Sequence, residues 1–152
     1  MPYAAIRIKV NQKDIPARLP PLIAEVRAWL EKNAVAPAGP PFFLYRWMDC
    51  DREMVAEVGL PVNDPLEAGG YVFGDAFPAA YYAVMQYSGN YRNIQQGHRI
   101  LESWLKKAGQ EAAADAASGS ICWGHLAEFY FSDPEQEPVA SRWKAEIIYR
   151  LH

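Results

Sequence analysis

The feature that most constrains the fold of this chain is an internal repeat. A tryptophan followed by Leu-x-Lys recurs 75 positions later, and a tyrosine six residues after a glycine recurs 85 positions later. Both copies then end on a glutamate followed by an aliphatic residue. The matched pairs are Trp29 and Trp104, Gly39 and Gly124, Tyr45 and Tyr130, and Glu57 and Glu146. Such a repeat predicts a duplicated structural unit within a single domain, 1–152.

Hydrophobic periodicity assigns the same four elements to each copy. Apolar residues alternate where a strand is expected and recur every three to four residues where a helix is expected. The expected elements are strands at 4–10, 42–47 and 54–62 with a helix at 20–33 in the first copy, and strands at 80–87, 126–131 and 143–151 with a helix at 91–108 in the second. The sequence therefore predicts an α+β fold, a tandem duplication of a strand–helix–strand–strand unit.

Two segments lie outside the repeat. Residues 63–78 are rich in Gly, Pro and Asp and are expected to connect the halves, with a short strand at 71–73. Residues 110–120 hold the extra length of the second copy and are expected to form a flexible loop or an irregular helical turn. With halves at about 1–62 and 79–152, we expect antiparallel sheets with one main helix per half and a central pocket between the halves, where ligand sites are common.

The strand expected at 126–131 places a carboxylate among apolar residues. Strand alternation points Leu126, Glu128 and Tyr130 to one face. A glutamate on a strand is usually solvated, but the repeat aligns Glu128 with Phe43, an apolar residue. Glu128 is therefore the candidate charged group of the pocket.

Aromatic residues make up 13% of the sequence, more than a core of this size uses, which suggests an aromatic-lined cavity or interface. Phe43, Tyr45 and Trp47 are expected to share a strand face with the pocket, whereas strand alternation alone places Tyr82. Trp104 lies at helical spacing, which fits core packing as well as ligand contact. The candidate ligand-binding residues are Glu128, Tyr130, Phe43, Tyr45, Trp47, Trp104 and Tyr82.

Composition disfavours several classes of protein. The net charge of −3 and the scattered Lys and Arg residues argue against direct nucleic-acid binding. The N-terminus lacks the apolar core of a signal peptide, and no run reaches the roughly 18 apolar residues of a membrane span, so we expect a cytoplasmic protein without a membrane partner. Cys50 and Cys122 lie far apart, and His98 and His125 have no second ligand at metal spacing. Neither a disulfide framework nor a metal or cofactor is expected.

Taken in order, these landmarks resemble the GyrI-like small-molecule-binding domain, which is also the effector-binding domain of MerR-type and AraC-type transcription activators. The resemblance spans nearly the whole chain. Its pieces are Ile15-Pro16, Gly39-Pro40-Pro41-Phe42 with Tyr45, Glu57-Val58 with Pro61-Val62, Gly89 with Tyr91, Trp104, Glu128 with Tyr130, Asp133-Pro134, and Glu146-Ile147. The chain departs from the family at Tyr87, Asn90 and Arg150, where His, Pro and Pro are usual.

The resemblance implies two fused α+β units around a central aromatic pocket with one acidic residue, here Glu128. Such pockets accept bulky planar or cationic drug-like molecules, so the expected partner is a hydrophobic aromatic or cationic small molecule. The activators join this domain to a DNA-binding helix-turn-helix. Because this chain begins at the first strand, it looks like a stand-alone sensor, scavenger or enzyme. The sequence does not identify a protein partner, which stays unknown.

Two kinds of chemistry fit a buried glutamate among rings. The carboxylate and the ring faces together suit a lipophilic cation. They also suit hydrolysis, with Glu128 as general acid or base and Tyr45 or Tyr130 orienting the substrate, and some stand-alone members of the resembling family hydrolyse strained cyclopropane-bearing cytotoxins. A gyrase-inhibitor role would need an exposed acidic or apolar patch, and haem binding an exposed axial His, so both have less support.

Overall fold

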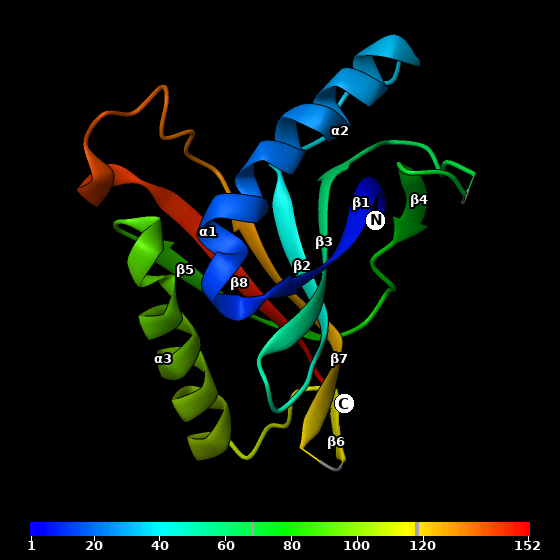
Figure 1. Cartoon of the computed structure of the whole chain (residues 1–152). Coiled ribbons are helices and arrows are strands. Elements are labelled where there is room, and N and C mark those ends of the chain that lie inside the picture. Colours follow the sequence, from blue (N-terminus) through cyan, green and yellow to red (C-terminus); the bar gives the residue numbers. More distant parts are fainter. Residues whose placement is uncertain (68, 118) are drawn as a thin grey trace.

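Two strand–helix–strand–strand units join in one antiparallel sheet (Figure 1). The computed structural model describes residues 1–67, 69–117 and 119–152. The first unit contains β1 (Pro2–Asn11), η1 (Gln12–Asp14), α1 (Ile15–Arg18), α2 (Pro20–Lys32), β2 (Phe42–Met48) and β3 (Glu53–Pro61). The second contains β5 (Tyr82–Ser88), η2 (Tyr91–Asn93), α3 (Ile94–Lys107), β7 (Ser120–Tyr130), η3 (Ala140–Arg142) and β8 (Lys144–Arg150). The short strands β4 (Phe73–Ala76) and β6 (Ala114–Ala117) have no counterpart in the other unit.

The strand order gives the sheet an internal symmetry. The order is β4-β1-β3-β2-β7-β8-β5, with β6 paired to β7, so the central β2–β7 pair joins two copies of the same three-strand arrangement. In this pair Phe43 lies directly opposite Glu128. These two residues are each other's counterparts in the repeat, so a pseudo-two-fold axis passes between them. The expected duplication is confirmed, although the two halves share one continuous sheet.

The helices of the two units begin and end in matching ways. The side chains of Asn11 and Asn90 each accept a hydrogen bond from the backbone N–H two residues later, which caps a short 3₁₀ turn before the main helix. At the other end, the carbonyls of Trp29 and Trp104 each accept from the N–H four residues later, at the C-cap. Trp29 and Trp104 therefore occupy equivalent places.

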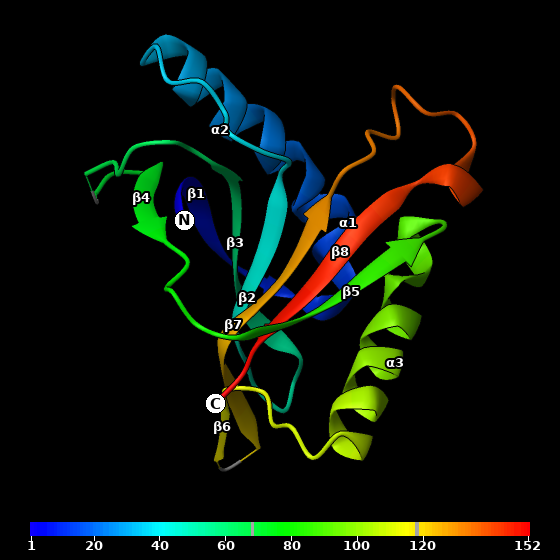
Figure 2. The ribbon, with the colours of Figure 1, turned by 180° about the vertical axis from the view of Figure 1, so that it is seen from behind.

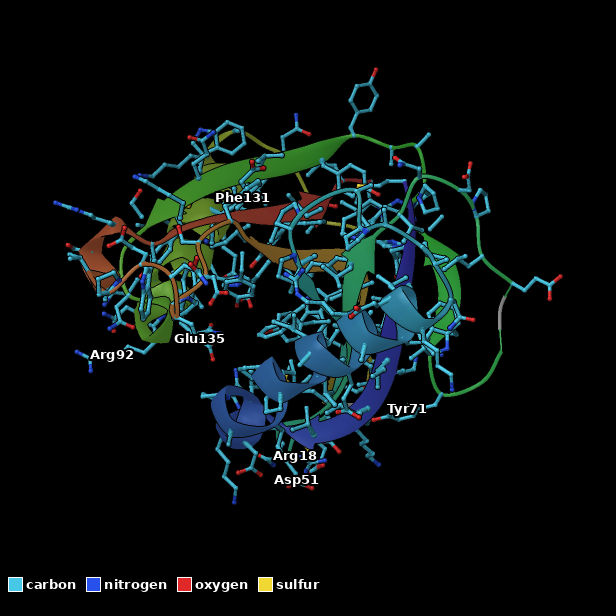
Figure 3. All side chains as sticks on the ribbon, turned by 90° about the horizontal axis from the view of Figure 1, so that it is seen from above. Arg18, Asp51, Tyr71, Arg92, Phe131 and Glu135 are labelled. Atoms are coloured by element: carbon cyan, nitrogen blue, oxygen red, sulfur yellow. The ribbon has the colours of Figure 1, made fainter. Side chains whose placement is uncertain are left out.

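Both main helices cover the same face of the sheet (Figure 1). α2 buries Leu22, Val26 and Leu30 there, and Figure 3 shows side chains filling the space between α2 and the strands. α3 lies close to the sheet at Gly97. A Cβ at Gly97 would lie 2.7 Å from Ile147 Cδ1 on β8, well inside contact distance. No helix within the described ranges is long and apolar enough to cross a bilayer.

The opposite face of the sheet is covered by the connection between β4 and β5 (Figure 2). Phe77 of this connection packs against Tyr3, Phe42 and Phe129, with ring centroids 5.2–5.6 Å from its own. Edge-to-face and tilted ring pairs at this spacing stabilise a core beyond their buried area. The central strands β2 and β7 are therefore buried on both faces.

The expected elements differ from the observed ones where the repeat gives no guidance. The strand expected at 71–73 lies at 73–76, where it pairs with β1. The segment 110–120, expected as a loop or helical turn, contains β6, which forms a hairpin with a β7 that begins at Ser120. The Ala-rich composition of this segment carries no strand alternation, so the hairpin depends on its pairing with β7.

Candidate functional site

Glu128, near the end of β7, is a buried carboxylate with three hydrogen-bond donors. Its side chain is only 1% exposed. Tyr45 and Tyr130 donate to the Oε1 atom at 2.7 and 2.5 Å, and His98 Nε2 lies 2.6 Å from Oε2. An unpaired buried carboxylate costs several kcal/mol. These three partners therefore make the burial of Glu128 tolerable.

His98 and Tyr149 extend the hydrogen-bond network of Glu128. The Tyr149 hydroxyl donates to the exposed carboxylate of Glu102 at 3.0 Å. The same hydroxyl lies 2.9 Å from His98 Nδ1, and His98 Nε2 lies 2.6 Å from Glu128 Oε2. The network therefore runs from the buried Glu128 through His98 and Tyr149 to Glu102 at the surface.

The same surroundings keep the tyrosines protonated. Burial, followed by the charge of Glu128 and its hydrogen bond, raises the pKa of Tyr45 well above its usual value of 10. Burial, Glu128 and the neighbouring Tyr45 raise the pKa of Tyr130 in the same direction. Both hydroxyls are therefore donors at neutral pH, and neither is an activated base.

A row of aromatic rings leads outward from Glu128. Phe43 packs on Tyr130 with ring centroids 4.8 Å apart, Tyr130 on Tyr91 at 4.7 Å, and Tyr91 on Trp143 at 5.0 Å. Phe43 is buried, whereas the other three are partly exposed. The row connects the buried carboxylate with the surface beside η2 and the start of β8.

The structure brings four of the seven predicted ligand-binding residues together: Glu128, Tyr130, Tyr45 and Phe43. Trp47 does not join them, because a β-bulge shifts the register of β2 between Tyr45 and Trp47. Tyr45 pairs with Ala56, but Trp47 pairs with Val55 on the opposite face of β3. The expectation that Trp47 shares a face with Tyr45 is therefore wrong.

Trp104 and Tyr82 also lie away from Glu128. The side chain of Trp104 is 56% exposed on the outer side of α3, beside Arg99 and Lys107. Tyr82 packs with the aromatic cluster on the other face of the sheet, and its hydroxyl donates to the Pro78 carbonyl at 2.9 Å. Neither residue contacts the cluster around Glu128.

Side chains enclose the Glu128 carboxylate. Phe43 and Tyr45 are each 6% exposed, and Glu128 itself is 1% exposed. Two cavities of the structure lie elsewhere and are lined by other residues. A ligand that reaches Glu128 must therefore move a neighbouring side chain.

Sequence reasoning missed His98 and Tyr149 as members of this cluster. The signal for His98 was present, because it falls on the apolar face of α3 with Ile94, Leu101 and Leu105. A histidine on a buried helix face requires a polar partner. Glu128 was the unpaired candidate, so the pair could have been predicted.

A second buried carboxylate, Glu57 on β3, lies on the opposite face of the sheet. It is 0% exposed and accepts from Tyr3 at 2.7 Å and from Arg7 and Arg46, each at 2.9 Å. Arg46 is the residue that the bulge in β2 turns toward this face. Its Nη1 also lies 3.3 Å from His125 Nε2. The Glu57 carboxylate is thus paired within the protein, whereas the buried Nδ1 of His125 has no hydrogen-bond partner among the described residues.

Comparisons with known proteins identify the fold. No protein-family model matches the chain, and a search of curated proteins finds no match. Solved structures do match over the whole chain. The C-terminal domain of EcmrR has a TM-score of 0.69 at 17% identity, covering 99% of this chain and 90% of that one. SAV2435 bound to tetraphenylphosphonium has a TM-score of 0.64 at 12% identity, covering 100% and 88%.

An EcmrR–DNA complex determined by cryo-electron microscopy has a TM-score of 0.72 at 16% identity. The match covers 99% of this chain and 53% of the EcmrR chain, so this chain spans about half the length of that protein. At these identities the likeness is one of fold, and it confirms the GyrI-like architecture expected from the sequence: the chain has the fold of the EcmrR C-terminal domain.

Proposed function

We propose that this protein binds bulky planar aromatic cations, with Glu128 as their charge partner and Phe43, Tyr45 and Tyr130 as aromatic walls. The observation that carries the proposal is a carboxylate 1% exposed and surrounded by rings. A lipophilic cation gains the carboxylate's attraction and about 0.5–2 kcal/mol from each ring face it meets. The shared fold of SAV2435, whose structure holds tetraphenylphosphonium, supports this reading.

The ligand replaces an internal partner. His98 Nε2 already occupies Glu128 Oε2 at 2.6 Å, so an incoming cation that pairs with this oxygen must displace the imidazole ring. The row Tyr130–Tyr91–Trp143 offers the route, because its outer members are partly exposed and a planar ligand can stack where these rings stack on one another.

Fluorescence titration with a rhodamine-type dye tests the proposal. We expect micromolar affinity, about −8 kcal/mol. Glu128→Gln keeps the shape of the side chain and removes its charge, so it should weaken binding of the cationic dye more than binding of a neutral analogue. Equal loss for both dyes would remove Glu128 as the charge partner.

Glu146→Gln is the matched control. Glu146 is the counterpart of a buried residue, Glu57, but it alternates on β8 with Ala145 and Ile147 and so points to the face away from Glu128. It is expected to leave both affinities unchanged within twofold. Circular dichroism of each variant separates loss of the site from loss of the fold.

A further inference from the structure

A cavity of about 400 Å³ lies beside α3, and two of its lining residues, Tyr149 and Glu102, also belong to the hydrogen-bond network of Glu128. The C-terminal half of α3 forms one wall, and the β6–β7 hairpin and β8 form the others. Its lining residues include Glu102, Leu105, Glu111, Ile121, Trp123 and Tyr149. The hairpin belongs to the extra length of the second unit, so the first unit has no equivalent cavity wall.

The walls combine apolar surface with an excess of negative charge. Leu105, Ile121 and Trp123 supply the apolar surface. Two carboxylates, Glu102 and Glu111, share the lining with one ammonium, Lys106. Within the described residues none of these three forms an ion pair within 4 Å. The charged side chains that line the cavity, two carboxylates and one ammonium, thus give it a net negative charge.

Tyr149 separates this cavity from the buried His98 and Glu128 side chains. Tyr149 lines the cavity, and its hydroxyl donates to Glu102 on one side and lies 2.9 Å from His98 Nδ1 on the other. The Glu102 carboxylate uses Oε1 for this bond, which leaves Oε2 for a further donor. Glu102 and Glu128 are therefore two distinct carboxylates, one accessible and one buried.

We propose that this cavity is a second ligand site, which binds a small organic ammonium ion with a single-ring body. The ammonium group donates to Glu102, and the ring lies against Trp123 and Ile121. The volume is at the low end for ligand pockets, so it suits one ring rather than the larger cations proposed for Glu128. A cation held between a carboxylate and an indole face gains from both.

Titration with 2-phenylethylammonium, followed by the indole N–H signal of Trp123 in NMR spectra, tests the proposal. We expect a saturable shift of this signal, and Glu102→Gln should raise the Kd at least fivefold. The neutral analogue 2-phenylethanol should bind more weakly and equally well to both proteins. Glu31→Gln, the same change at an exposed position on α2, should leave the Kd unchanged.

Glu128→Gln distinguishes this proposal from the proposed function. If the second site is real, Glu128→Gln leaves the ammonium titration within twofold of the wild type. Loss of the titration in Glu128→Gln with retention in Glu102→Gln would overturn the second site and leave the Glu128 site standing. Loss of dye binding in Glu102→Gln, with dye binding retained in Glu128→Gln, would overturn the Glu128 site and leave the second site standing. A Trp123 signal that does not move at any ligand concentration would also reject the cavity site.

Discussion

His98 Nε2 lies 2.6 Å from Glu128 Oε2, and both side chains are buried. The carboxylate proposed to attract a cation thus already has an internal partner. The affinity for an external cation is therefore lowered by the free energy of the contact that the cation replaces.

Removing this internal partner should strengthen ligand binding. His98→Gln removes the imidazole that occupies Glu128 Oε2, so the affinity for a cationic dye should rise severalfold while that for a neutral analogue stays the same. Dye titration of the purified variant measures this. An unchanged or weaker affinity for the cation, in a variant with native circular dichroism, would contradict the exchange of partners.

Tyr45 and Tyr130 should be energetically coupled, because both donate to Glu128 Oε1. Tyr45→Phe and Tyr130→Phe should each lower the free energy of unfolding by about 1–2 kcal/mol. The double variant should lose more unfolding free energy than the two single variants lose together, because removal of the second hydroxyl leaves Glu128 Oε1 without a donor. Urea unfolding of the four proteins measures the coupling, and strict additivity would argue against a shared acceptor.

The same tyrosines should make the fold sensitive to alkali. Their pKa values are raised in the folded protein, so the unfolded chain releases these protons near pH 10 while the folded protein holds them. Their stabilising contribution is full below pH 10 and is lost as the pH rises above it. Between pH 8 and pH 10.5, the urea midpoint should fall less for the double Phe variant than for the wild type.

The Glu57 cluster should depend unequally on its two arginines. The side chain of Arg46 is 23% exposed and that of Arg7 is 52% exposed, although both reach Glu57 at 2.9 Å. Arg46→Ala should cost about 2–3 kcal/mol because it leaves a buried carboxylate short of a partner. Arg7→Ala should cost about 1 kcal/mol or less. Chemical denaturation ranks the two, and a larger cost for Arg7→Ala would reverse this account.

His125 should weaken the fold in acid. Burial, followed by the charges of Arg46 and Arg150, lowers the pKa of His125 from 6.5 to about 4, against the opposing pull of Asp75 and Glu57. Between pH 6.5 and 4 the unfolded chain binds a proton at His125 and the folded protein does not. The free energy of unfolding therefore falls as the pH decreases through this range. The loss is on the order of 2 kcal/mol. In His125→Asn the unfolding free energy should change less over this range.

Catalysis is the alternative to binding at Glu128. We expect a cyclopropane-bearing alkylator, incubated with catalytic amounts of protein, to give no ring-opened product beyond one equivalent. The carboxylate is engaged by three donors, and the nearby hydroxyls are held protonated. Mass spectrometry follows the product. Multiple turnovers that disappear in Glu128→Gln would establish an enzyme.

The repeat made most of the fold predictable, because an element assigned in one half could be checked at the equivalent positions of the other half. The equivalence of Trp29 with Trp104 and the strand face of Glu128 both followed from the sequence. The bulge at Arg46 could not be predicted, because the extra residue did not show in the hydrophobic alternation of this strand. The bulge turns Trp47 to the face opposite that of Tyr45. Trp104 was placed correctly on its helix, but helical spacing alone did not show that its side chain points to solvent.

The partners of Glu128 were harder to predict than the residue itself. Tyr45 and Tyr130 lie on paired strands, so alternation places them beside it. His98 comes from α3, and its reach depends on how closely the helix approaches the sheet, which Gly97 permits. Sequence periodicity fixes which face a residue takes. It does not fix the distance between a helix and the strands beneath it.

The position of Glu128 on the pseudo-two-fold axis limits how charge can be arranged in this fold. A residue on the axis faces its own counterpart across one strand pair, about 5 Å away. A glutamate at position 43 would therefore put two carboxylates side by side in the core. A perfectly symmetric version of this protein could not carry an ionised acid there. A single carboxylate here requires the two halves to carry different residues at positions 43 and 128. The site therefore depends on a sequence difference between the two copies of the repeat.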